Sequence, residues 1–130
     1  MIDENQHTGD ARTQSMSTEL ANALVALHKE QFGRGPTRAS ARFAGPDAIL
    51  IVLEDALLPA ERALVDLDQA LRVIETRSAF QVATAERFIA IIEEITGRTV
   101  RSFASALDAQ TGTAFEVCLL EPLFPGDAAE

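Results

Sequence analysis

Hydrophobic residues recur at helical spacing early in the chain. A Ser-Thr pair at 17–18 can cap a helix, and Gly33 is a typical C-terminal stop. The apolar positions between them are three or four residues apart: Leu20, Ala23, Leu24 and Leu27. This spacing predicts an amphipathic helix over Thr18–Phe32. The polar, aperiodic residues 1–16 before it are predicted to form a disordered tail.

After Gly35 and Pro36 the hydrophobic period changes to two. Ala39, Ala41 and Phe43 alternate with Arg38, Ser40 and Arg42, as in a strand with one buried face. Residues 45–47 are Gly-Pro-Asp, which is turn chemistry, and residues 48–54 (AILIVLE) are apolar and rich in β-branched side chains. The pattern predicts a β-hairpin.

The middle of the chain returns to helical spacing. Pro59 suits a first helical turn, and an apolar stripe follows at Leu64, Leu67, Leu71 and Ile74. The pattern is interrupted around residues 76–80, where Thr76 or Ser78 can cap a new helix, and it resumes until Gly97. Two helices are predicted, over roughly 59–75 and 78–96; one long kinked helix is the alternative.

The last apolar segments alternate again. Residues 99–107 and 113–120 are predicted strands, joined by DAQTG with Gly112 free to take a positive φ. The predicted order is therefore α-β-β-α-α-β-β, an α+β two-layer sandwich in which helices pack on a four-stranded, mainly antiparallel sheet. Residues 17–121 form one domain in this interpretation, followed by an acidic tail over 122–130.

Composition narrows the classes of function. The chain has 130 residues, 47% of them hydrophobic, and a net charge of −9. Non-specific nucleic-acid binding needs Lys and Arg against phosphates, so this balance argues against a nucleic-acid partner. No apolar run is long enough for direct membrane insertion, and the N-terminus lacks the basic and apolar regions of a secretory signal. A single cysteine forms no internal disulfide, and we expect a cytoplasmic protein.

Catalytic and metal-binding patterns find little support. His7 and His28 have no motif partners, and His28 is predicted to be a surface or boundary residue. Cys118 lies in a predicted strand and is expected to be a small packed hydrophobe. There is no clustered set of metal ligands and no phosphate-binding or nucleophile motif. We expect a non-enzymatic protein without metal or cofactor; an enzyme of unrecognised type is the minor alternative.

One stretch, EQFGRGPTRASARF at 30–43, combines two glycines with three arginines. Glycines permit a backbone that presents successive N–H groups, and arginines add charge, so the loop can bind an anion or an acidic partner. The candidate residues are Arg34, Gly35, Arg38, Arg42 and, from the helix layer, Arg77. The competing interpretation is a helix stop and a tight turn, with arginines on the solvent face of a strand.

The chain also resembles the MpsC-like family of small bacterial proteins over about residues 18–120. The matching positions are Glu30, Gly33, Gly35, Pro36, Asp47, Leu58, Pro59, Glu61, Arg77, Ile95, Thr96, Gly97, Val100 and Asp108. The segment DALLPAE departs from the Gly-containing turn and Thr before Pro that family members usually have.

The resemblance implies an accessory cytoplasmic part of a membrane-potential-generating, cation- or inorganic-carbon-linked transport system. It supplies no catalytic residues. We expect such a protein to act by association with a membrane transport protein, and to form a homodimer because a two-layer fold leaves sheet edges or a face to cover. The alternative function is a stand-alone binding domain for a small anion at the GRGP loop.

Overall fold

The computed structural model describes residues 4–123. Its elements, in chain order, are α1 (Glu4–Phe32), β1 (Arg38–Phe43), β2 (Ala48–Glu54), α2 (Pro59–Asp66), α3 (Ala70–Thr96), β3 (Val100–Asp108) and β4 (Thr113–Leu120). The predicted α+β class and the order α-β-β-α-α-β-β are both confirmed. The start of the predicted N-terminal tail and most of the predicted C-terminal tail, residues 124–130, lie outside the described residues.

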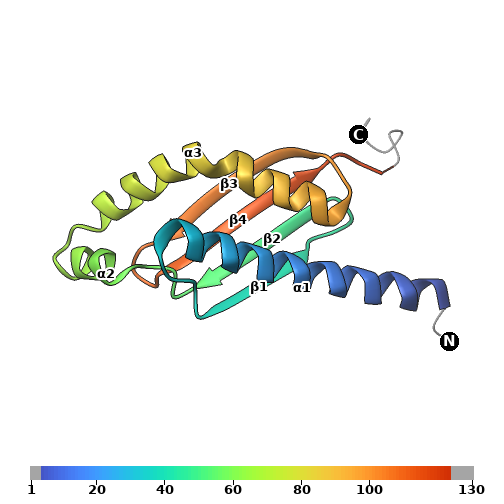
Figure 1. The fold of residues 1–130 in the computed structure, drawn as a ribbon, viewed down its shortest axis with the longest axis horizontal. Helices are drawn as coiled ribbons and strands as arrows, with labels where there is room; N and C mark the ends of the chain where they lie inside the picture. Colours follow the sequence, from blue (N-terminus) through green and yellow to red (C-terminus); the bar gives the residue numbers. More distant parts are fainter. Residues whose placement is uncertain (1–3, 124–130) are drawn as a thin grey trace.

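The four strands form one antiparallel sheet in the order β1-β2-β4-β3. Each predicted hairpin is present, and the two hairpins join through β2 and β4 at the centre of the sheet. Helices α1 and α3 lie on the same face of the sheet, and α2 lies at one end of the molecule (Figure 1). The result is a two-layer sandwich whose second sheet face has no helix on it among the described residues.

The core lies between the helices and the sheet. Leu20 and Leu24 of α1 meet Ile51 of β2 and Ile92 of α3, and each of these side chains is fully buried. Cys118 belongs to the same cluster, which confirms its prediction as a packed hydrophobe. Burial raises the pKa of the Cys118 thiol to about 11, so it is an unreactive neutral thiol at pH 7.

Helix α1 begins at Glu4, much earlier than the predicted Thr18. The prediction of a disordered tail over residues 1–16 is therefore wrong for residues 4–16. Residues 4–16 lack an apolar stripe in the sequence, and this part of α1 projects past the end of the sheet (Figure 1). Once a packed helix exists, adding each further turn costs little, so a helix can extend beyond the segment whose sequence shows an apolar stripe.

The break between the middle helices falls at residues 67–69, not near residue 76. Asp68 takes a positive φ of 59°, which ends α2, and α3 then runs without interruption. Thr76 does not cap a helix, because its Oγ1 donates to the Arg72 carbonyl one turn earlier, at 2.9 Å. The break also rotates the helical faces, so Leu67 and Leu71 of the predicted stripe are 70% and 66% exposed.

Candidate functional site

The structure separates the predicted arginine patch into two groups. Arg34 and Arg77 lie on the helical side of the sheet, near the C-terminal end of α1. Arg38 and Arg42 alternate with the inward-facing Ala41 and so occupy the opposite sheet face. No single surface therefore contains all the predicted site residues.

The GRGP loop is an internal support of the fold. Arg34 Nη2 lies 3.0 Å from the Asp55 carboxylate, and its Nη1 donates to the Leu57 carbonyl at 2.5 Å. Gly35 packs against α1 so closely that an added Cβ would lie 3.3 Å from a Val25 methyl group. The charge of Arg34 is thus compensated within the chain, and the loop holds α1 against the segment after β2.

Arg77 forms a nearly buried ion pair with Glu61. Its Nε and Nη2 donate to the two carboxylate oxygens at 2.7 and 2.6 Å, and the two side chains are only 11% and 12% exposed. Nη2 also donates to the Ala56 carbonyl at 2.7 Å. The guanidinium carbon lies 3.9 Å from the centre of the Phe32 ring, a cation–π contact. This bidentate geometry is the strongest form of an Arg–carboxylate pair.

His28 is the third member of this cluster. It is 3% exposed, so the prediction of a surface or boundary position is wrong. Nδ1 lies 3.0 Å from the Arg34 carbonyl and Nε2 lies 3.2 Å from Arg77 Nη1. Because the carbonyl only accepts and the guanidinium only donates, the contacts assign a neutral ring with its proton on Nδ1. Burial lowers the pKa of His28, and the nearby Arg77 charge lowers it further.

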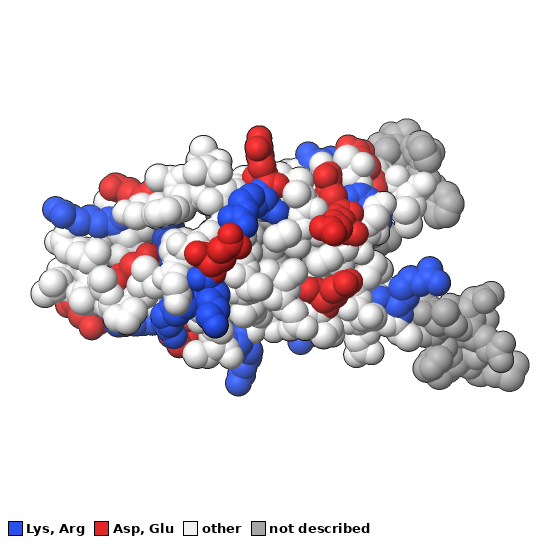
Figure 2. All heavy atoms as spheres, in the orientation of Figure 1, with Lys and Arg blue, Asp and Glu red and all other residues white. Residues whose placement is uncertain are grey.

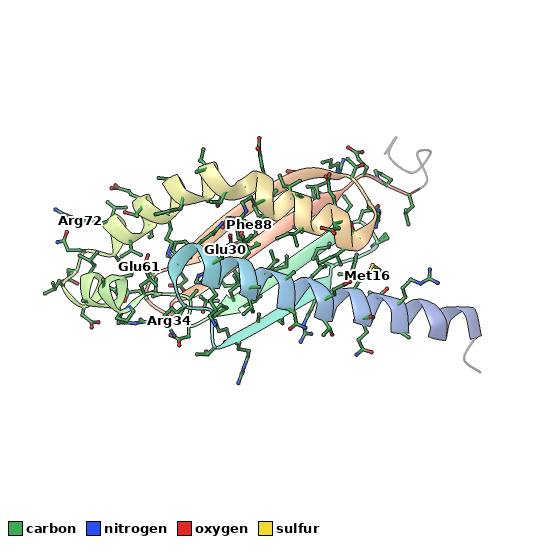
Figure 3. All side chains as sticks on the ribbon, viewed as in Figure 1. Met16, Glu30, Arg34, Glu61, Arg72 and Phe88 are labelled. Atoms are coloured by element: carbon green, nitrogen blue, oxygen red, sulfur yellow. The ribbon has the colours of Figure 1, made fainter. Side chains whose placement is uncertain are left out.

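Glu61 supplies the negative charge of the cluster. Burial raises the pKa of its carboxyl group, but hydrogen bonds from Arg77 and from the Leu58 N–H outweigh burial and leave the pKa below its usual value. Glu61 is therefore ionised and neutralises Arg77. Figure 3 shows Arg34 and Glu61 at the same end of the molecule, where α2 meets the C-terminal end of α1. The cluster joins α1, α2 and α3 at this point.

A small cavity of about 50 Å³ adjoins the cluster, between α1, α3 and strands β3 and β4. Its walls include His28, Gln31, Arg77, Phe88 and Glu116. Glu116 is 5% exposed, and its Oε2 has no hydrogen-bond partner; Gln31 Nε2 is buried and unpartnered as well.

Sequence reasoning missed Glu116, although a signal was available. Ala114, Cys118 and Leu120 alternate in β4 as the buried face, and Glu116 occupies the same inward register. Carboxyl groups are rarely buried in a strand register of apolar residues, so a glutamate at this position indicates a candidate site.

We expect the free energy of unfolding to depend on pH because the Glu116 carboxyl group is buried. Burial raises the pKa of Glu116 to about 7, against which the Ser105 hydroxyl and the Arg77 charge act. An acid with a raised folded-state pKa stabilises the fold fully below its unfolded pKa of 4.5, and that stability is lost as the pH rises to about 7. The free energy of unfolding of the wild-type protein should therefore fall, relative to that of Glu116→Gln, by on the order of 3 kcal/mol between pH 4.5 and pH 8.

Urea unfolding at pH 4.5, 6 and 8 measures this difference, with the exposed Glu94→Gln on α3 as the matched control. A wild-type-minus-variant difference that does not change with pH would contradict the buried, neutral-acid assignment.

A wider groove of about 720 Å³ runs between α1 and the edge strand β1. Thr13, Ser17 and Thr18 form part of its helical wall, and Arg42 is the only charged residue among the described residues that line it. Unlike the smaller cavity, it has no buried polar atom without a partner among its lining residues. The groove therefore shows no preference for a ligand.

The uncovered sheet face, which we call the open sheet face, is apolar at its centre. Its apolar members, from β2 and β4 and from β3, are Ala48, Leu50, Val52, Phe115, Val117, Leu119, Ala104 and Ala106. Leu50 and Val117 are cross-strand partners and are 36% and 44% exposed. The helical face differs, since Lys and Arg side chains are interspersed there with Asp and Glu (Figure 2).

Polar side chains border the open sheet face at the two edge strands. Arg38 and Arg42 lie along β1, and Asp108 ends β3. Arg38 approaches Glu54 at 3.7 Å but is 80% exposed, and Arg42 forms no ion pair within residues 4–123.

The described part of the chain has neither a cluster of metal ligands nor a membrane-spanning helix. No group of three or more His, Cys, Asp or Glu side chains is placed to hold a metal ion there. None of the helices described is both long and apolar enough to cross a membrane.

Comparison with known proteins places the chain in a family. A Bacillus subtilis (strain 168) protein named "Uncharacterized protein YbcI" is 29% identical over 108 residues, which cover 80% of this chain and 86% of that protein. No solved structure shows significant similarity. Residues 12–122 match the family described as "Na+-translocating membrane potential-generating system (MpsC)". The match spans most of the chain, including both hairpins and the Arg77 cluster, and the protein therefore belongs to the MpsC family.

Proposed function

We propose that this protein is a non-enzymatic, cytoplasmic accessory or regulatory protein of a membrane cation or inorganic-carbon transport system, and that it acts through protein association. The family description supports the link to a membrane-potential-generating system. The observation that carries the mode of action is the open sheet face, an apolar surface on which no helix packs among the described residues. Exposed apolar surfaces of this kind mark association sites in soluble domains.

The first occupant that we propose for this face is a second copy of the chain. Two sheets pack face to face with their strands within about 30° of each other. A two-fold axis parallel to the strands then places β1 of one copy over β3 of the other, and β2 over β4. In this arrangement Leu50 meets Val117 of the second copy, so the most exposed apolar residues of the face cover each other.

The same axis also pairs opposite charges. Arg38 and Asp108 lie at the same end of the sheet, on its two edge strands. The two-fold axis places Arg38 of each copy above Asp108 of the other. Self-association through this face is therefore complementary in charge as well as in apolarity.

The size of the face sets the expected affinity. Standard strand spacings give a footprint of about 19 by 20 Å for the paired parts of the four strands. Such a footprint, about 380 Å² per copy, is roughly half of the 800 Å² per partner of a standard specific interface, so we expect a weak dimer with a dissociation constant in the micromolar range. The homodimer is, in this proposal, the form that associates with the membrane system.

Affinity purification from detergent-solubilised host membranes tests the accessory role. Tagged wild-type protein should recover an integral cation or inorganic-carbon transport protein, and the variant Val117→Arg should recover at least tenfold less. Val82→Arg is a matched control, because Val82 is 79% exposed on α3, away from the open sheet face. If wild-type protein enriches no transport protein, the accessory role is wrong.

Anion binding at the GRGP loop gains no support from the geometry. Arg34, the charge at its centre, already contacts Asp55 and the Leu57 carbonyl. We therefore do not propose a ligand site there.

A further inference from the structure

Two buried polar groups face the cavity beside Arg77 without partners. Glu116 Oε2 and Gln31 Nε2 each lack a hydrogen bond, and both residues line the cavity. Leaving a buried polar group unpaired costs about 1–3 kcal/mol, so such groups are rare unless something else fills the site. A donor on one wall and a carboxyl oxygen on another define a polar site between α1 and β4.

The charges around the cavity favour an acceptor-rich ligand. Gln31 offers unpaired N–H donors from α1. Arg77, on α3, has five N–H groups, of which four are used by Glu61, Ala56 and His28, so one is left. A cation beside this guanidinium would be repelled, whereas an acceptor oxygen can take a hydrogen bond from the spare N–H.

The protonation state of Glu116 decides whether an anion can enter. His28 and Gln31 face it from α1, Arg77 and Gln81 from α3, and Ser105 from β3. Among these residues only Arg77 is charged, and Glu61 neutralises it. An ionised Glu116 would repel an anion, but a protonated Glu116 supplies a further donor, as one member of a carboxyl–carboxylate pair does.

The volume restricts the ligand to a very small molecule. A water molecule needs about 10–15 Å³ of such space, so the cavity has room for only three or four non-hydrogen atoms. Phe32 and Phe88 on its walls suit a small apolar group on one side. Phe80, which also lines it, is 45% exposed and marks a side open to solvent.

We propose that this cavity binds a small carboxylate of the size of formate or acetate, together with one proton held by Glu116. The unpaired Gln31 amide and the spare Arg77 N–H donate to the carboxylate, and protonated Glu116 donates a third hydrogen bond. Binding therefore consumes one proton from solution whenever Glu116 is ionised in the free protein, and the affinity falls as the pH rises.

Calorimetric titration with sodium formate and sodium acetate tests the proposal, with sodium chloride at equal ionic strength as the reference. We expect binding at pH 6 and at least fivefold weaker binding at pH 8, since the affinity falls about tenfold per pH unit once Glu116 is ionised. Titrations at pH 8 in two buffers of different ionisation enthalpy should show uptake of close to one proton per carboxylate. No binding of either carboxylate at pH 6 up to 50 mM would overturn the proposal, and so would binding without proton uptake.

Two variants separate the roles of the side chains. Glu116→Gln keeps a donor at the site, so it should bind formate with no proton uptake and with the same affinity at pH 6 and 8. Gln31→Leu should weaken formate binding at least tenfold at pH 6, and Glu94→Gln, outside the cavity, should behave as wild type. Wild-type pH dependence in Glu116→Gln would overturn the assignment of the proton, even if Gln31→Leu fails to fold.

Discussion

Replacing Arg77 with methionine should lower the free energy of unfolding by about 3–5 kcal/mol, the typical cost of removing one partner of a buried ion pair. Methionine keeps most of the stem that covers Phe32 but leaves the Glu61 carboxylate nearly buried and unpaired. The Ala56 carbonyl and His28 Nε2 lose their donors at the same time. Urea unfolding at pH 7 measures the effect.

Arg72→Met is the matched control, because Arg72 is an exposed arginine on the same helix. It should change stability by no more than about 0.5 kcal/mol. Adding Glu61→Leu to Arg77→Met should restore at least about 1 kcal/mol, since the double variant has no unpaired buried charge. A loss below about 1 kcal/mol in Arg77→Met would show that the pair contributes little and that Arg77 is not a structural centre.

The strands were predictable because each has one buried face. The bounds of β1, Arg38–Phe43, follow directly from the alternation of small apolar residues with arginines. In β2 the apolar run predicted the second strand of a hairpin, which its pairing with β1 confirms, and its pairing with β4 places it in the interior of the sheet. The same alternation correctly put Arg38 and Arg42 on one face.

The helices were less predictable, for local reasons. The end of α2 depends on the positive φ of Asp68, a backbone state that has no hydrophobic signature. The first part of α1 projects past the end of the sheet, and no apolar stripe in its sequence indicates a helix. Hydrophobic periodicity detects a helix only where it has an apolar stripe. It therefore indicates neither the end of α2 at Asp68 nor the first part of α1.

The polar cluster could not be assembled from the sequence, because its contacts join distant residues. Arg77 lies 49 residues from His28 and 16 from Glu61 along the chain. Arg34 and Arg77 looked like free charges for that reason, and only the fold shows their partners. Glu116 is different, since its inward register in β4 was readable from the sequence once Cys118 and Ala114 were taken as buried.

The second large effect concerns the open sheet face: Val117→Arg should convert the protein from a dimer to a monomer. Val117 is 44% exposed and, under the two-fold arrangement, packs against Leu50 of the second copy. Arginine at this position places two unpaired charges in the apolar centre of the interface, one from each copy. Burial of such groups without partners is strongly unfavourable, so the dissociation constant should rise at least a hundredfold, about 2.7 kcal/mol.

Light scattering coupled to gel filtration, over about 1–100 µM protein, measures this change. Val82→Arg makes the same substitution at an exposed α3 position and should remain dimeric. Arg38→Glu should weaken the dimer by a smaller factor and reduce its sensitivity to salt, because Arg38 contributes an exposed charge at the border of the face.

A monomeric wild-type protein at 100 µM would refute self-association, and a dimer unchanged in Val117→Arg would place the interface elsewhere. Because Val117 does not contribute to the buried core, the variant should keep the unfolding free energy of the monomer, and a loss of dimer with intact folding then identifies the open sheet face as the interface.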